Sequence, residues 1–224
     1  MSKFKRLALI GFVSAMFSAA SVQANVLYSN DFETASTFGL SGVTDIQTAP
    51  GNGQKFIGFL NLGSFTALTL NTAGISRILL KFDLYTLESL DGDSLTWGAD
   101  YFDLNVNSTA SLLRATFSNH PFVDFPQSFG GAGSPAGTGS DSTLTGTLGY
   151  NYTIDVLDHT YHLTFETDVS SDTTVLNFIG NTNQGWSDEG FGIDNIQVSS
   201  VPVPGALTLF GSAILGFSLR KREA

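Results

Sequence analysis

Residues 77–85 read Arg77-Ile78-Leu79-Leu80-Lys81-Phe82-Asp83-Leu84-Tyr85, and every second residue from 78 to 84 is apolar. Successive side chains of an extended chain point to opposite faces, so these four apolar side chains would share one face. The segment YHLTF at 161–165 repeats the pattern with two aromatic residues and a leucine. Alternation with a period of two predicts half-buried β-strands.

Similar runs of β-branched and aromatic residues continue on both sides, separated by clusters of Gly, Asn, Asp and Ser. No stretch of residues 26–199 sustains the 3.6-residue period of a helix. Short strands with turn signals between them predict an all-β antiparallel sandwich. The Gly- and Ser-rich segment 128–142 predicts a mobile surface loop. Strands are expected near residues 26–32, 55–61, 65–70, 77–85, 101–107, 112–118, 144–156, 160–167, 174–179 and 191–198.

The composition fits one globular domain, because 42% of the 224 residues are hydrophobic and 13% are charged. The absence of cysteine excludes a disulfide scaffold and a zinc–thiolate site. Residues 25–200 hold four basic and 19 acidic residues. A body of this charge repels phosphate backbones, so nucleic acid is not an expected partner.

The N-terminal segment has the three parts of a secretory signal peptide. Three basic residues, an apolar run at 7–20 and the small-residue site Val22-Gln23-Ala24 follow one another. The alternative is a retained anchor helix, but the apolar run is shorter than the ~20 residues that span a bilayer. We therefore expect residues 1–24 to form a signal helix that is removed after Ala24.

The C-terminal segment, residues 201–224, combines a proline motif, an apolar run and a basic cluster. Val201-Pro202-Val203-Pro204 precedes the apolar residues 206–219, and Arg220, Lys221 and Arg222 follow at once. The uncharged stretch is close to the ~20 residues that cross a bilayer as a helix, and the basic cluster would stay on the cytoplasmic side. A short final helix of a soluble domain is the alternative, because two glycines interrupt the run.

This tail, VPVPGALTLFGSAILGFSLRKREA, resembles a PEP-CTERM sorting signal, which has these three parts in this order. The resemblance covers about the last two dozen residues, and Val203 stands where the namesake motif has Glu. It implies a Gram-negative bacterium that makes exopolysaccharide, a membrane tether through the C-terminal helix, and recognition by exosortase. The protein would be the substrate of that enzyme and would reach the cell surface or the extracellular matrix.

The body at residues 25–200 resembles the jelly-roll sandwiches of the concanavalin-A-like and MAM-like group. The resemblance rests on Asp31-Phe32-Glu33, on the segment 82–93 and on the closing motif DEGFGIDNIQV at 188–198. It implies an antiparallel jelly roll that binds at a surface, in a superfamily that also contains glycosidases. The expected function is a non-catalytic structural or carbohydrate-binding component of the exopolysaccharide envelope, with a secreted glycoside hydrolase as the alternative.

In that fold the first and last strands lie together, which would bring Asp31 and Glu33 to Asp194 and Asn195. Asp31 and Glu33, two apart on a strand, would share a face, as would Asp194 and Ile196. Carboxylate and amide oxygens are ligands of Ca²⁺, so these residues predict a structural calcium site. The alternative is a set of solvated edge carboxylates with Asn195 in a turn. The acidic segments 88–93 and 188–189 predict an ion site less strongly, because most such clusters are turns.

Other candidate residues concern catalysis and sugar binding. Glu166 and Asp168 could form the carboxylate pair of a glycoside hydrolase. However, serines stand at 170 and 171, where sandwich glucanases continue the pattern with Glu. Trp97 and Trp186 lie in loops rich in Gly and Asp, where an indole ring could stack on a sugar, or could instead pack its loop onto the sandwich. The three histidines and the missing G-x-S-x-G motif predict no serine triad.

Overall fold

The alternating segment forms the long strand β6 (Arg77–Glu88), whose apolar side chains at 78, 80, 82 and 84 are buried, whereas Arg77 and Lys81 are exposed. The computed structural model describes residues 23–122, 124–185 and 187–202. Within them, a compact unit spans Ala24–Val201. The period of two thus predicts both the strand and its inward face.

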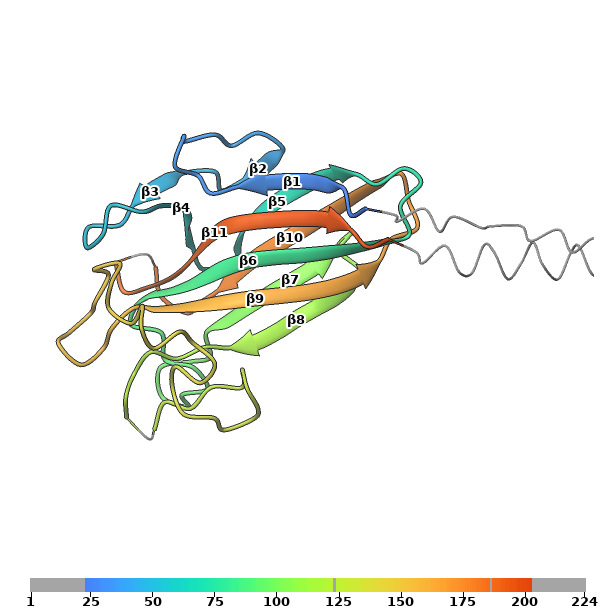
Figure 1. Ribbon diagram of the computed structural model, residues 1–224. Coiled ribbons are helices and arrows are strands. Elements are labelled where there is room, and N and C mark those ends of the chain that lie inside the picture. Colours follow the sequence, from blue (N-terminus) through green and yellow to red (C-terminus); the bar gives the residue numbers. More distant parts are fainter. Residues whose placement is uncertain (1–22, 123, 186, 203–224) are drawn as a thin grey trace, which may run out of the picture. The chain divides into compact units, whose positions relative to one another are not determined.

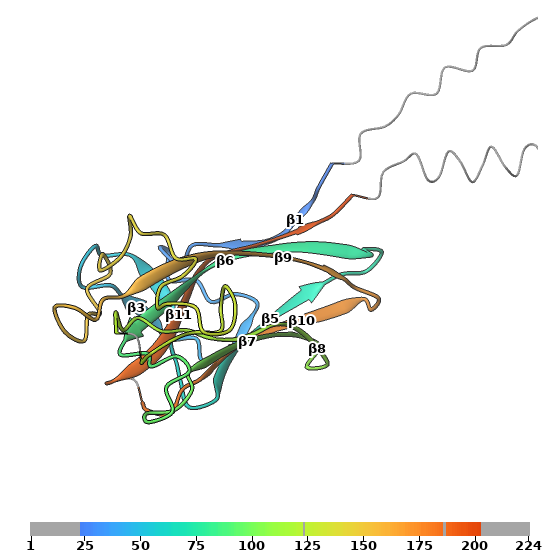
Figure 2. The same cartoon turned by 90° about the horizontal axis from the view of Figure 1, so that it is seen from below.

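Within the described part of the chain, eleven strands form two antiparallel sheets (Figures 1 and 2). The six-stranded sheet has the order β3-β4-β11-β6-β9, with β1 also paired to β11, and the five-stranded sheet has the order β2-β5-β10-β7-β8. Besides β6, the strands are β1 (Val26–Asn30), β2 (Leu40–Gly42), β3 (Ile46–Thr48), β4 (Lys55–Leu60), β5 (Ser64–Asn71), β7 (Tyr101–Val106), β8 (Ala110–Thr116), β9 (His159–Asp168), β10 (Thr173–Asn181) and β11 (Glu189–Ser200).

The strand order of β4 to β11 is that of a jelly roll. Four of these strands stand in one sheet as β4-β11-β6-β9 and the other four face them as β5-β10-β7-β8. The chain therefore crosses repeatedly from one sheet to the other, and the first and last of the eight strands are neighbours. The all-β antiparallel sandwich expected from the sequence is confirmed.

The core between the sheets is rich in phenylalanine. Phe82 packs edge-to-face on Phe178 at 5.1 Å between ring centroids, and Phe102 lies 5.4 Å from Phe191. Fully burying such a side chain contributes about 1.5–3 kcal/mol. A second apolar cluster, made of Ala49, Phe56, Tyr85, Leu87 and Leu148, involves strands of the six-stranded sheet only.

The prediction of a strand at residues 144–156 is wrong. This segment forms turns, and Gly146 and Gly149 both have positive φ. The Asp158 carboxylate, fully buried, accepts hydrogen bonds from the backbone N–H groups of Leu148, Gly149 and Tyr150 at 2.8–3.2 Å. A side chain thus satisfies the donors that a neighbouring strand would otherwise have to satisfy. The short strands β2 and β3 were not expected.

The segment 128–142 is a loop, as expected, and the buried side chain of Gln127 anchors it. The Gln127 amide donates to the carbonyls of Phe129 and Thr138, and its oxygen accepts from the N–H groups of Ser118 and Gly137. No helix among the residues that the structure describes could span a membrane. The expected signal helix and C-terminal helix lie outside these residues.

Candidate functional site

Asp31 and Glu33 do not share a strand face, which corrects the expectation for this pair. Strand β1 ends at Asn30, whose side-chain oxygen accepts the N–H of Phe32 at 2.9 Å, and Phe32 adopts a φ of 55°. The chain therefore turns at this point. Asp31 accepts the N–H of Glu33 at 3.2 Å, and Glu33 accepts the N–H of Lys55 at 2.9 Å.

Asp194 and Ile196 also fail to share a face, because β11 is irregular between them. Asn195 has a φ of 49° and the register with β6 shifts there, so Ile193 and Ile196 both enter the core. The buried Asp194 carboxylate accepts hydrogen bonds from the Tyr85 hydroxyl at 2.8 Å and the Gln54 amide at 2.7 Å. Burial raises the pKa of Asp194 to about 6.

The structure brings only part of the predicted calcium site together. Asp31 and Asn195 line one groove of about 730 Å³, beside Tyr28 and Phe38. Asn195 donates its side-chain N–H to Asp83 at 2.8 Å. Among the residues that the structure describes, Asp31, Glu33 and Asp194 do not form a group of three carboxylates within ligand range of one another. Calcium at these four residues stays a prediction.

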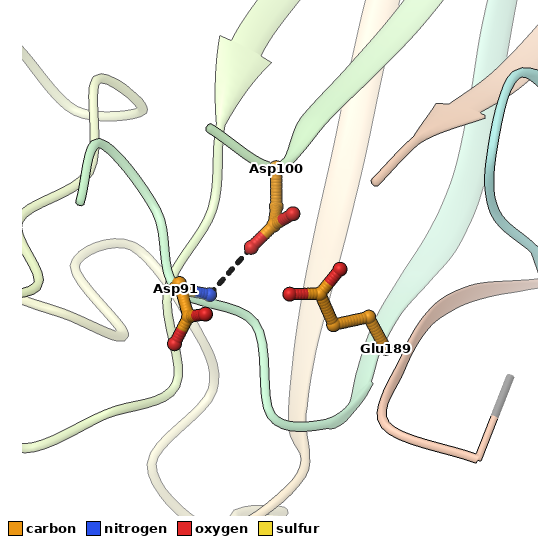
Figure 3. A group of neighbouring side chains, drawn as sticks. All are labelled: Asp91, Asp100 and Glu189. Carbon is orange, nitrogen blue, oxygen red and sulfur yellow. Dashed lines mark hydrogen bonds between the residues drawn. The ribbon is translucent and has the colours of Figure 1, made fainter. Parts of the chain in front are cut away.

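A different group of carboxylates does converge (Figure 3). One oxygen each of Asp91, Asp100 and Glu189 lies within 4.8 Å of the others, and the three side chains are 5%, 0% and 0% exposed. Asp91 and Asp100 stand at the two ends of a loop between β6 and β7, and Glu189 is the first residue of β11. We call these three residues the carboxylate cluster.

The carboxylates of the cluster lie too close together, and are too deeply buried, for all of them to be ionised without an energetic cost. The Asp100 carboxylate accepts the N–H of Asp91 at 2.5 Å, and Glu189 accepts the N–H of Gln184 at 2.7 Å. Burial and the neighbouring carboxylates raise the pKa of Asp100 to about 7 and that of Glu189 to about 8. Near neutral pH the pair can therefore hold a proton or a hard cation.

Part of this cluster is recognisable in the sequence. Asp91 and Glu189 belong to the acidic segments that predicted an ion site less strongly, whereas Asp100 was missed. The sequence signal that could have indicated Asp100 is that Asp91 and Asp100 flank one segment without apolar alternation. In the structure this segment is a loop whose two ends lie together. Asp100 donates its N–H to the carbonyl of Gly92 at 3.0 Å, and this second contact completes the closure.

The loop from Asp91 to Asp100 carries Trp97 in its turn over residues 94–98. The Ser94 side-chain oxygen accepts the N–H of Trp97 at 3.3 Å, and Asn183 donates to the Trp97 carbonyl at 3.1 Å. Gly92, with a φ of 64°, lies so close to the Pro126 carbonyl that a Cβ there would overlap it. Trp97 is 57% exposed.

Trp97 lines a groove of about 480 Å³. A hydrogen bond of 2.7 Å from the N–H of Asp93 to the carbonyl of Pro126 joins the two segments that form it. Phe125 stacks on the buried His120 ring at 4.3 Å, and His120 lies 3.1 Å from an Asp91 oxygen. Asp124 is exposed in the opposite segment. The groove is also lined by Ser94, Leu95 and Thr96. We call it the Trp97 groove.

The remaining predicted residues do not join this site. Glu166 and Asp168 are exposed on β9, and Asp168 forms an ion pair with Arg77 at 2.7 Å. They therefore do not provide the grooved carboxylate pair that the hydrolase alternative needs. Trp186 lies outside the described residues, as do Val203, Pro204, Arg220, Lys221 and Arg222 of the sorting motif. Val201 and Pro202 are described, and Val201 donates its N–H to the Arg77 carbonyl.

No family model matches the chain, and no curated protein matches it. Among solved structures, a family 35 carbohydrate binding module from an environmental isolate superposes with a TM-score of 0.39 and 15% identity, covering 80% of this chain and 100% of the module. A family 35 module from Clostridium thermocellum gives 0.36 and 10% identity, covering 81% and 100%. A family GH115 4-O-methyl-alpha-glucuronidase gives 0.39 and 11% identity, covering 88% of this chain and 20% of that chain. Scores below 0.5 do not establish a common fold.

Proposed function

We propose that this chain is an exported, non-catalytic surface protein that binds polysaccharide through the Trp97 groove. The observation that carries the proposal is the position of Trp97, which is more than half exposed on a groove whose other walls hold hydroxyls and carboxylates. A sugar ring has an apolar face that an indole can cover, and its hydroxyls can donate hydrogen bonds to carboxylates. Because hydrogen bonds fix the groove's two segments, little ordering is required on binding.

The arrangement of the body suits presentation from a membrane. The two ends of the body meet where Asn25 and Ser200 exchange hydrogen bonds of 2.8–2.9 Å. Glu189, at the other end of β11, belongs to the cluster that underlies the Trp97 loop. At about 3.3 Å per residue, Glu189 lies some 35 Å along the strand from the point where a tether would leave. In this proposal the C-terminal segment anchors the body in the inner membrane until exosortase sorts or releases it.

Calcium is the structural cofactor that we propose, and the carboxylate cluster supplies donors of the right chemistry. Ca²⁺ takes carboxylate and carbonyl oxygens, and Asp91, Asp100 and Glu189 offer three buried carboxylates. The raised pKa values of Asp100 and Glu189 indicate a site that gains from added positive charge. The residues predicted from the sequence, Asp31, Glu33, Asp194 and Asn195, are the second candidate.

The test is binding of the full chain, purified in detergent, to an array of oligosaccharides and to exopolysaccharide. Trp97→Ala should lower the affinity at least tenfold, because an aromatic ring at the centre of a small site supplies a large part of the binding free energy. Tyr152→Ala is the matched control, since Tyr152 is 51% exposed and does not line the groove. Equal loss in both variants, or no loss in Trp97→Ala, would refute the proposed site.

A further inference from the structure

The loops around the Trp97 groove carry acidic charge and no Lys or Arg. Segments 89–100 and 117–158 contain seven Asp residues and not one Lys or Arg. The described basic side chains lie elsewhere. Arg114 binds Asp103 and stacks on Tyr101, Arg77 binds Asp168, and Lys55 donates to the Glu33 carbonyl. No Lys or Arg in these two segments neutralises their acidic side chains, and His120, 3.1 Å from an Asp91 oxygen, is the one basic residue within them.

Two acidic residues, Asp93 and Asp124, line the same groove as Trp97. Asp124 is exposed on one segment, and Asp93 on the other uses one carboxylate oxygen to accept the Thr116 hydroxyl at 2.7 Å. Arg and Lys are absent from the residues that line this groove. A cation held there would be attracted by two carboxylates and by the face of the indole ring.

The residues that line the groove should discriminate among three classes of sugar. A uronic acid would place its carboxylate against Asp93 and Asp124, so it is repelled. A neutral or N-acetylated sugar gains stacking and hydrogen bonds, but no charge–charge attraction. A sugar with an ammonium group gains all of these contacts. Resting on the proposed polysaccharide-binding function, we propose that the Trp97 groove selects polysaccharide whose sugars carry ammonium groups, that is, a polymer of de-acetylated amino sugars.

The experiment compares three oligomers of equal length on the full chain in detergent, at about pH 6 so that the amines are protonated. The probes are a glucosamine oligomer, its N-acetylated form and a uronic-acid oligomer. The glucosamine oligomer should bind at least tenfold more tightly than the acetylated one, with a preference that falls as salt is added. Asp124→Asn should reduce this preference without weakening the acetylated oligomer, whereas Trp97→Ala should weaken both.

Glu166→Gln is the matched control for general attraction between an acidic protein and a polycation, because Glu166 is exposed on β9 away from the groove. It should leave all affinities unchanged. An equal loss in Glu166→Gln and Asp124→Asn would overturn the inference. Trp97-dependent binding with no preference for the amine, or with a preference for the uronic acid, would overturn it while leaving the proposed function intact. No Trp97-dependent binding of any probe would overturn both.

Discussion

The buried carboxyl groups of Asp100 and Glu189 make the free energy of unfolding depend on pH. Their pKa values in the folded state, about 7 and 8, lie above the unfolded values near 4. The folded state therefore binds protons more tightly, and the free energy of unfolding falls as the pH rises from about 4 towards 8. For Asp100 alone, three pKa units correspond to an upper limit of about 4 kcal/mol.

We expect Asp100→Asn to flatten this dependence in the presence of a chelator. Asparagine retains an oxygen for the N–H of Asp91 but removes one charge, so the variant should melt above the wild type at pH 8 and close to it at pH 5. Asp124→Asn is the control, because Asp124 is exposed in a neighbouring loop. Thermal unfolding followed by circular dichroism measures the effect, and parallel pH curves for all three proteins would contradict it.

Calcium at the carboxylate cluster makes a second prediction at the same residues. An ion that binds only the folded state at a hundred times its Kd adds about 2.7 kcal/mol, which corresponds to roughly 5–10 °C in the melting midpoint. A chelator should lower the midpoint of the calcium-loaded chain by that amount. The response should vanish in Asp100→Asn and persist in Asp194→Asn. The reverse result would return the ion to the predicted clasp, and an indifferent wild type would exclude structural calcium.

At the scale of elements, alternation predicted β6 and β9 because each buries one face of a sheet. It failed at residues 144–156, where the apolar residues resemble a strand but Asp158 takes the backbone donors. It also could not predict the change of face in β11, because a left-handed Asn195 leaves no periodic signal. The carboxylate cluster depends on loop closure, so only one of its two loop residues could be recognised from local sequence.

Asp158 therefore supports the segment of residues 144–157, which forms turns and belongs to neither sheet. Asp158→Ala should lower the free energy of unfolding by about 3 kcal/mol, because it leaves three backbone donors without their acceptor. Amides of residues 144–157 should also exchange faster with solvent. Asp155→Ala is the control, since Asp155 is exposed, and it should change stability by less than ~0.5 kcal/mol. Urea unfolding and hydrogen exchange measure both effects. Equal stability of the two variants would show that the segment does not depend on Asp158.

For the whole molecule, the position of the groove depends on the folded body, whereas the proposed destination depends on the two end segments. The body places its two ends together and its aromatic groove at the opposite end of β11, which sequence alone could not show because it depends on how β1 pairs with β11. The proposed export and tethering would depend on hydropathy and charge in segments 1–24 and 201–224, which are readable from sequence without any tertiary contact.

Removing residues 201–224 should therefore change where the protein goes without changing its fold. The full chain should fractionate with the envelope or the cell surface, whereas the truncated chain, still carrying its signal peptide, should be exported and not retained by the membrane. Replacing Arg220, Lys221 and Arg222 by alanine tests the basic cluster separately, because it leaves the apolar run intact and should lower the fraction correctly oriented or sorted. Immunoblots of cytoplasmic, membrane, surface and medium fractions measure the outcome. A full-length chain that stays in the cytoplasm, or a truncated chain with an unchanged distribution, would show that these segments do not direct the protein to the surface.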